Sequence, residues 1–260
     1  MFIASVSRTL LGLYLVLGDS ISSGVGVSRP QAAFNQLLVH NDAATYPSYV
    51  DRDLQSAGGA QVQQVNLAAS GATAHASLQA LRTWVNAQPR PVTDKQVLVT
   101  LTVGGNDLKN ALAAAPRAGG LHALRKAAAS QLRRTIDDLD AIADILTDAA
   151  RFPKGVRLLV ANIYDPSDGR DRIITRFGPY PLPGFAKVIA EWNAAYAAWA
   201  TKRQVTLIDA HAAFLGHGYV YSPGQAASKT TQSYFADPLH PNDQGHAALR
   251  TLFWDAIAAP

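Results

Sequence analysis

The run Leu11-Gly-Leu-Tyr-Leu-Val-Leu17 is a short apolar stretch that leads directly into Gly18-Asp19-Ser20. A continuous apolar run of this length is typical of a strand that is buried on both faces of a sheet. The glycine ends the run, and the serine follows in the turn. Because ligands bind at the carboxyl ends of parallel strands, we expect Ser20 to face a crevice there. Taken alone, Gly-Asp-Ser is also an ordinary turn sequence.

Four further strand-like runs alternate with segments of helical spacing. The runs cover residues 62–67, 97–103, 157–162 and 205–208. Apolar side chains three and four residues apart indicate helices within residues 121–146, 185–199 and 249–257. This alternation favours a parallel sheet covered by helices on both faces. The chain has no internal repeat, low-complexity tract or evident linker, so we predict a single domain over residues 1–260.

Composition narrows the class of protein. Of the 260 residues 48% are hydrophobic and 16% are charged, which indicates a globular chain. The absence of cysteine excludes disulfides, thiolate nucleophiles and cysteine zinc sites. The formal charge is +4, but the basic residues are spread along the chain. The densest group, at residues 125–134, shares a predicted helix with five aspartates at positions 137–148. We therefore expect a solvated helix face, with neither a nucleic-acid partner nor a metal site.

The longest apolar run is far shorter than the ~20 residues that a membrane-spanning helix needs. We therefore expect no integral membrane segment. The first predicted strand leads directly into Ser20, which leaves no room for a separate targeting region and cleavage site. This favours a cytoplasmic protein, with secretion as the alternative if a leader peptide has been removed.

Polar and glycine-rich clusters follow three of the predicted strands and precede the last helix. The clusters are Gly18-Asp19-Ser20, Ser70-Gly71, Gly104-Gly105-Asn106-Asp107 and Asp237-Pro-Leu-His240-Pro241. Since the ends of parallel strands meet at one edge of a sheet, we expect these clusters to share one crevice.

The clusters contain the parts of a nucleophilic site. A serine hydroxyl attacks a carbonyl only when a base takes its proton, and a neutral imidazole suits that role. A carboxylate that accepts the other imidazole N–H fixes its tautomer. We predict Ser20 as nucleophile, His240 as base and Asp237 as the orienting carboxylate. His246 is the weaker candidate base, because it falls inside the last helix and no comparable carboxylate precedes it.

Acyl transfer also requires donors for the oxyanion of its tetrahedral intermediate. The backbone N–H groups of Ser20 and Gly71 and the side-chain amide of Asn106 are the candidates. Asp19 is expected to support the Ser20 turn from behind, and Asp107 to cap the helical turn that follows it.

These segments together resemble the blocks of the SGNH (GDSL) hydrolase family, and they occur in the family's order from residue 18 to residue 240. The resemblance implies a flavodoxin-like three-layer α/β/α sandwich with a five-stranded parallel sheet of order 2-1-3-4-5. It also implies the triad and oxyanion donors named above, and no cofactor. The Gly-x-Ser-x-Gly signature of α/β-hydrolases is absent around Ser20, so that fold is not predicted.

The function predicted from these observations is a serine carboxylester hydrolase. Its expected partner is a small acyl ester of short or medium chain, as in lysophospholipases or thioesterases of the family. A carbohydrate O-acetyl esterase and a non-catalytic protein that binds acylated ligands are the alternatives. The segment 164–183 is rich in aromatics and prolines, and either lines a substrate pocket or is a plain packed connection. On the first reading, Tyr164, Tyr180 and Leu182 contact the substrate. The sequence leaves the oligomeric state open.

Overall fold

The structure is a computed structural model that describes residues 11–58, 62–114, 120–175, 178–219 and 233–259. At its centre lies a five-stranded parallel sheet made of β1 (Leu11–Gly18), β2 (Gln63–Asn66), β3 (Gln96–Thr102), β4 (Val156–Ala161) and β7 (Thr206–Ile208). The strand order is β2-β1-β3-β4-β7, which is 2-1-3-4-5 when only the strands of this sheet are counted. The fold class and strand order predicted from the sequence are therefore confirmed.

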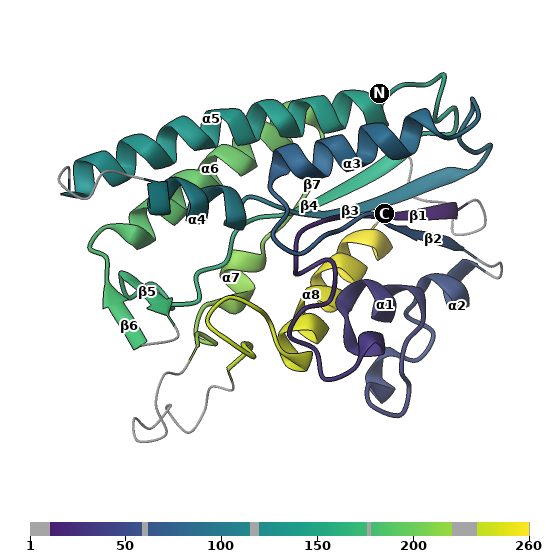
Figure 1. Cartoon of the computed structure of the whole chain (residues 1–260). Coiled ribbons are helices and arrows are strands. Elements are labelled where there is room, and N and C mark those ends of the chain that lie inside the picture. The colour runs from purple at the N-terminus through teal and green to yellow at the C-terminus, as the bar shows by residue number, and fades with distance from the viewer. Residues whose placement is uncertain (1–10, 59–61, 115–119, 176–177, 220–232, 260) are drawn as a thin grey trace.

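Helices cover both faces of the sheet, which gives three layers (Figure 1). One face carries α3 (Ala74–Asn86), α5 (Gly120–Leu146) and α6 (Phe185–Arg203), and the other carries α1 (Phe34–Val39) and α8 (Asp243–Ala258). The shorter elements are α2 (Leu54–Gly58), α4 (Gly105–Ala114), α7 (Ala210–Phe214) and two 3₁₀ turns at Pro30–Ala32 and Pro47–Tyr49. Within the described ranges, none of these helices has both the length and the apolar character to cross a membrane.

β1 lies in the interior of the sheet and is buried on both faces. Leu13, Leu15 and Leu17 pack in the core under α3, α5 and α6. Tyr14 and Val16 point the other way, into the core under α1 and α8. Burying each aliphatic side chain stabilises the fold by about 1.5–3 kcal/mol. This strand holds Ser20 at its carboxyl end.

Residues 164–183 differ from the loop that the sequence suggested. They contain a two-stranded antiparallel hairpin, β5 (Arg172–Thr175) and β6 (Gly178–Pro181), separate from the main sheet. The two prolines of β6 favour an irregular segment in the sequence. Proline has no backbone N–H to donate to a neighbouring strand, so within sheets it is confined to edges. A two-stranded sheet consists of edges alone, so the prolines are tolerated here.

The aspartates of α5 are not simply a solvated face. His75 on α3 contacts Asp138 at 3.1 Å, and the indole of Trp199 on α6 donates to Asp140 at 2.9 Å. Arg203 pairs with Asp144. The acidic residues thus also join α5 to the helices beside it, while Asp144 stays largely exposed, at 67% of its side chain, as expected of a solvated face. In the part of the chain that the structure describes, no three His, Asp or Glu side chains are placed to hold a metal ion.

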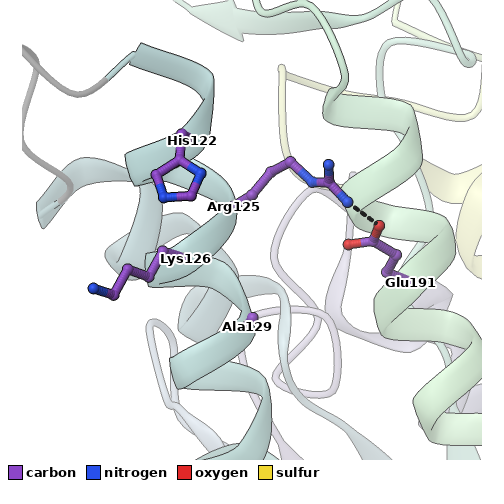
Figure 2. A pocket seen from close by; sticks show the side chains of 5 residues that line it. All are labelled: His122, Arg125, Lys126, Ala129 and Glu191. Atoms are coloured by element: carbon purple, nitrogen blue, oxygen red, sulfur yellow. Dashed lines mark hydrogen bonds and ion pairs between the residues drawn. The ribbon is translucent and has the colours of Figure 1, made fainter.

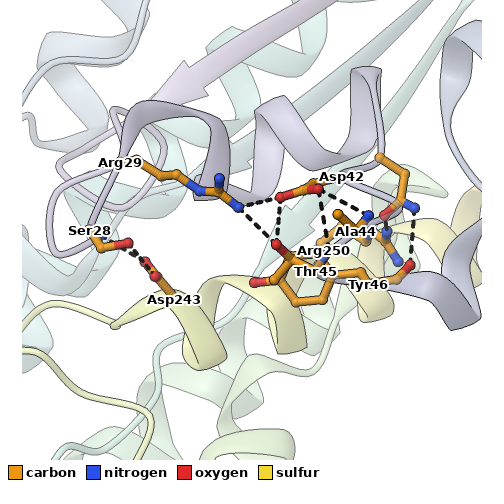
Figure 3. A network of polar contacts seen from close by, with 9 residues as sticks. Ser28, Arg29, Asp42, Ala44, Thr45, Tyr46, Asp243 and Arg250 are labelled. Carbon is orange, nitrogen blue, oxygen red and sulfur yellow. Dashed lines mark hydrogen bonds and ion pairs between the residues drawn. The ribbon is translucent and has the colours of Figure 1, made fainter.

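A polar network fastens the segment after Ser20 to α8 (Figure 3). Ser28 donates its backbone N–H to Asp243 at 2.7 Å, at the start of the helix. Further along, the buried Arg250 bonds to Asn41 and lies 3.5 Å from the ring centre of Tyr49. The network joins residues near position 40 to the last helix of the chain.

His246 of α8 is wholly buried and continues this junction. Its Nδ1 accepts the backbone N–H of Phe34 at 3.3 Å, so Nε2 carries the proton and donates to the carbonyl of Val25, also at 3.3 Å. The N–H of Val25 in turn donates to the carbonyl of Ser20. Burial lowers the pKa of His246 to about 4 and keeps the imidazole neutral. The residue therefore clamps the Ser20 loop to α8.

This burial predicts a pH-dependent stability. An unfolded chain protonates His246 near pH 6.5, whereas the folded protein does so only near pH 4. The stabilisation is therefore complete above pH 6.5 and falls by up to about 3 kcal/mol as the pH is lowered to 4. Urea unfolding should show that the wild type loses stability relative to His246→Gln as the pH is lowered from 6.5 to 4.

His122→Gln serves as the control, because His122 is exposed on α5. Its unfolding free energy should follow the wild type at each pH. Parallel pH curves for the wild type and His246→Gln would contradict the assignment of a buried neutral imidazole.

Candidate active site

The end of β1 places Ser20 at the carboxyl edge of the sheet. Gly18 pairs in register with Thr102 of β3, and the backbone N–H of Asp19 donates to the carbonyl of Thr102 at 3.0 Å. Gly18 has a φ of +137°, which other residues rarely adopt. The chain therefore turns sharply at this point, and the loop closes when the N–H of Val25 donates to the carbonyl of Ser20 at 2.9 Å.

Asp237 and His240 lie in a tight turn just before α8. The Asp237 Oδ1 accepts the backbone N–H groups of Leu239 and His240 at 2.8 and 2.9 Å. Its Oδ2 lies 2.7 Å from Nδ1 of the His240 imidazole. Burial acts to raise the pKa of Asp237, but the hydrogen bonds from His240 and from the two backbone N–H groups outweigh it and lower this pKa. The side chain is therefore a carboxylate at neutral pH.

The other imidazole nitrogen of His240 faces the serine. His240 Nε2 lies 3.0 Å from Ser20 Oγ, so hydroxyl, imidazole and carboxylate form one chain of hydrogen bonds. The two residues are 220 positions apart in the sequence. With Nδ1–H donating to Asp237, Nε2 is free to accept the serine proton. The structure thus brings together the three residues that the sequence singled out.

Asp19 is buried directly behind Ser20. Its Oδ1 accepts the backbone N–H of Ile21 and the hydroxyl of Thr102, both at 3.0 Å. Ser22 Oγ lies 2.7 Å from the same Thr102 hydroxyl oxygen. Burial raises the pKa of Asp19 from 3.8 to about 6, while these hydrogen bonds oppose the rise. The side chain thereby holds the turn that carries the serine.

The three candidate oxyanion donors lie on one cleft. Within the described residues, the backbone N–H groups of Ser20 and Gly71 donate no hydrogen bond. Gly71 has a φ of +81° and open space where a Cβ would be, so its backbone angle alone requires glycine. The Asn106 amide donates one N–H to the carbonyl of Ala72 at 3.1 Å, and its oxygen accepts from Lys109 at 2.9 Å. Its second N–H remains for a ligand.

Asp107 has a different role from the cap that the sequence predicted. Its Oδ2 accepts the backbone N–H of Ala74, at the start of α3 and not of the helix that contains Asp107. Its Oδ1 accepts from Gln131 and Thr135 of α5 at 3.2 Å. Burial raises the pKa of this carboxyl group. The side chain joins three helices behind the Gly71 turn, and no local sequence pattern indicates such a link.

The cleft beside Ser20 has a volume of about 490 Å³, within the ~300–1,000 Å³ usual for ligand pockets. Most of its wall is apolar, and the lining combines residues of α4, α5 and α6 with residues that follow β1, β3 and β4. Among the large apolar side chains that line it are Leu108, Leu112, Leu124, Leu182, Phe185 and Ile189. Tyr164 also lines the cleft. Tyr180, on the hairpin, is 67% exposed and is not among the described residues that line it.

Tyr164 makes a contact that the sequence did not reveal. Its hydroxyl donates to the carbonyl of Leu239, the residue before His240, at 2.6 Å. Its ring stacks on Phe214 with centroids 4.8 Å apart. The residue was predicted from its position in an aromatic segment as a substrate contact. Its hydrogen bond to the Asp237–His240 turn could be found only in three dimensions.

A second hollow of about 490 Å³ lies on the surface between α5 and α6 (Figure 2). Its lining includes His122, Lys126 and Arg125, and the last of these pairs with Glu191 at 2.7 Å. No serine or aspartate lines it, so the described chain offers no hydroxyl nucleophile there.

Comparison with known proteins identifies the family. A model of the GDSL-like lipase/acylhydrolase family matches residues 16–248, which contain all four motif clusters. The chain belongs to this family. As a GDSL acylhydrolase it is a carboxylic ester hydrolase that acts on small-molecule esters. No curated protein matches the sequence of this acylhydrolase.

Solved structures share the fold of this GDSL acylhydrolase at low sequence identity. A lipase from a goat rumen metagenome matches with a TM-score of 0.60 and 18% identity, over 95% of this chain and 97% of the lipase. A phospholipase A1 from Streptomyces albidoflavus NA297 matches with a TM-score of 0.54 and 20% identity, over 96% of this chain and 100% of its own. An esterase from Pseudoalteromonas sp. matches with a TM-score of 0.51 and 16% identity, over 95% and 96% of the two chains.

The burial of Asp19 predicts how the stability of the acylhydrolase depends on pH. Because the folded pKa of about 6 exceeds the ordinary 3.8, the folded state holds a proton that the unfolded chain releases. The free energy of unfolding should therefore fall by up to about 3 kcal/mol as the pH rises from 4 to 6. Asp19→Asn removes this ionisation, and denaturant unfolding at intervals from pH 4 to 7 should show the wild type losing stability relative to the variant.

Asp137→Asn is the matched control, because Asp137 is exposed on α5. It should leave the pH dependence as in the wild type. A constant difference between the wild type and Asp19→Asn across the range would show that burial does not perturb Asp19.

Proposed function

We propose that this GDSL acylhydrolase cleaves short- to medium-chain acyl esters with Ser20 as nucleophile, His240 as base and Asp237 as the orienting carboxylate. The observation that carries the proposal is the 3.0 Å contact between His240 Nε2 and Ser20 Oγ, with the Asp237 carboxylate 2.7 Å behind Nδ1. Ser20 and His240 line an apolar cleft that is large enough for an acyl chain.

In the first half of the reaction, Ser20 Oγ attacks the ester carbonyl carbon while His240 Nε2 takes the hydroxyl proton. The carbonyl oxygen becomes an oxyanion, for which Ser20 N–H, Gly71 N–H and the free Asn106 N–H are the proposed donors. Such donors act strongly because they are positioned before the charge develops. The intermediate collapses when the bond to the alcohol oxygen breaks and His240 returns its proton to that oxygen. An acyl-enzyme on Ser20 remains.

The lining of the cleft supports an acyl ester over an acetylated sugar. An acetyl group would cover little of the apolar wall formed by α4, α5 and α6, whereas an acyl chain gains about 0.8 kcal/mol for each methylene that it buries. A protein that only binds acylated ligands would not need an aligned serine, imidazole and carboxylate. Lysophospholipids and acyl thioesters both fit the requirement for an apolar acyl group.

Replacing the nucleophile should abolish turnover. Ser20→Ala is expected to lower kcat on a nitrophenyl ester by roughly 10⁴–10⁶-fold, because no other hydroxyl replaces the attacking oxygen. It should also abolish covalent labelling by a fluorophosphonate. The fold should persist, as far-ultraviolet circular dichroism can check.

Ser77→Ala is the matched control, since this buried serine on α3 has an Oγ without a hydrogen-bond partner in the described structure. It should keep both turnover and labelling. Covalent labelling of Ser20→Ala by the fluorophosphonate would refute the proposed nucleophile. So would a folded wild type that the reagent does not label.

The acyl site can be tested through chain-length preference. Leu182→Ala removes an apolar wall group and should lower kcat/KM for medium-chain nitrophenyl esters about tenfold relative to the acetate, from roughly 1.4 kcal/mol of lost contact. Tyr180→Ala, on the exposed hairpin, should keep the wild-type profile. Unchanged preference in Leu182→Ala would place the acyl chain elsewhere.

A further inference from the structure

The turn at residues 235–241, which carries Asp237 and His240, is held mainly by its own hydrogen bonds. The backbone N–H of Ala236 donates to the carbonyl of His240 at 2.9 Å, and Asp237 accepts the three N–H groups described above. Phe235 and Pro241 form an antiparallel bridge across its base. These bonds fix the shape of the turn but do not fix its place relative to the sheet.

Two hydrogen bonds connect this turn to distant parts of the described chain. One is the contact of His240 Nε2 with Ser20 Oγ at 3.0 Å. The other is donated by the hydroxyl of Tyr164, just beyond β4, to the carbonyl of Leu239 at 2.6 Å. The remaining hydrogen bonds from the turn, among the residues that the structure describes, reach only residues 233 and 242 beside it in the chain.

Tyr164 is well placed to act as a fixed support. Its side chain is buried, stacks on Phe214 at 4.8 Å and meets the edge of Phe235 at 5.3 Å between ring centroids. Burial, together with the nearby charges of Asp19 and Asp237, raises the pKa of its hydroxyl. The hydroxyl therefore keeps its proton at neutral pH and remains a donor. A rigid ring with few rotatable bonds holds the oxygen in one place.

The two connections differ in what happens to them during the reaction. In the acyl-enzyme, Ser20 Oγ is part of an ester and has no proton to share with His240. The Tyr164 bond involves no reacting atom and persists. We propose that Tyr164 is a positioning residue that holds the His240 turn in place for hydrolysis of the acyl-enzyme. This inference rests on the triad under "Proposed function".

Hydrolysis of the acyl-enzyme needs the imidazole at a fixed distance from a water molecule. His240 Nε2 takes a proton from the water as the water oxygen bonds to the acyl carbon. The resulting intermediate collapses when the bond between the acyl carbon and Ser20 Oγ breaks, and Nε2 returns the proton to Oγ. The acid is released. At this stage Asp237 still orients the imidazole within the turn, but no bond to Ser20 anchors the turn. The hydrogen bond from Tyr164 to Leu239 is then the one that ties the turn to a distant part of the described chain.

Tyr164→Phe removes the hydroxyl alone and keeps the ring. We expect hydrolysis of the acyl-enzyme to slow about five- to tenfold, which matches the loss of one buried hydrogen bond. Acylation should change less than twofold, because Ser20 still guides the imidazole. On nitrophenyl butyrate, stopped-flow measurement should show a burst of one nitrophenol per active site. In the steady state, kcat and KM should fall together, leaving kcat/KM as in the wild type.

Rates are expressed per active site titrated with a fluorophosphonate, so any unfolded fraction of the variant is not counted. Tyr14→Phe is the matched control, because it also removes a buried hydroxyl, one bonded to Thr100 Oγ1 at 2.8 Å inside the sheet. It should lower stability and leave both phases unchanged. The same burst and the same fall in kcat in Tyr14→Phe would mean that general loosening, not positioning, causes the effect.

Three outcomes separate this inference from the proposed function. A folded wild type that neither hydrolyses the ester nor reacts with the fluorophosphonate would overturn the triad itself. An active wild type with Tyr164→Phe unchanged in kcat and KM, or with kcat/KM reduced as much as kcat, would overturn the role of Tyr164 alone. A changed chain-length preference in Tyr164→Phe would assign the hydroxyl to substrate binding and also contradict the inference.

Discussion

The pairing of β1 with β3 is the constraint on which the rest of the site depends. Gly18 lies opposite Thr102, and the hydroxyl of Thr102 donates to Asp19 while its carbonyl accepts the N–H of the same residue. A slip of one position would turn the apolar side chains of β1 to the wrong layer. Register therefore fixes the end of β1, and with it the distance from Ser20 to the Asn106 turn after β3.

Two buried titratable groups flank the Ser20 loop and respond to pH in opposite directions. Asp19 takes up a proton more readily in the folded state, whereas His246 takes one up less readily. Between about pH 4 and 6 the two contributions to stability oppose each other. Both side chains are fixed by hydrogen bonds to backbone groups close to Ser20, which is why neither can be exposed without moving the nucleophile.

Much of this site could be predicted because it follows from local patterns. The apolar run of β1, the small residues around Gly71 and the Asp237–His240 spacing each indicate a structure within a few residues. The hairpin at 172–181 was missed because its prolines imitate a loop. The bond from Tyr164 to Leu239 spans 75 positions and that from His246 to Val25 spans 221, so no local periodicity reveals them. Such contacts depend on how the layers stack.

The triad joins the first strand of the described chain to its last helix, with consequences during synthesis on the ribosome. Ser20 is synthesised first, and His240 follows only 220 positions later, just before α8. Until α8 docks, the Ser20 loop lacks the imidazole of His246 that clamps it, and the hydroxyl has no base. With the proposed triad, a nascent chain therefore cannot hydrolyse esters before the segment up to α8 has been synthesised and has docked.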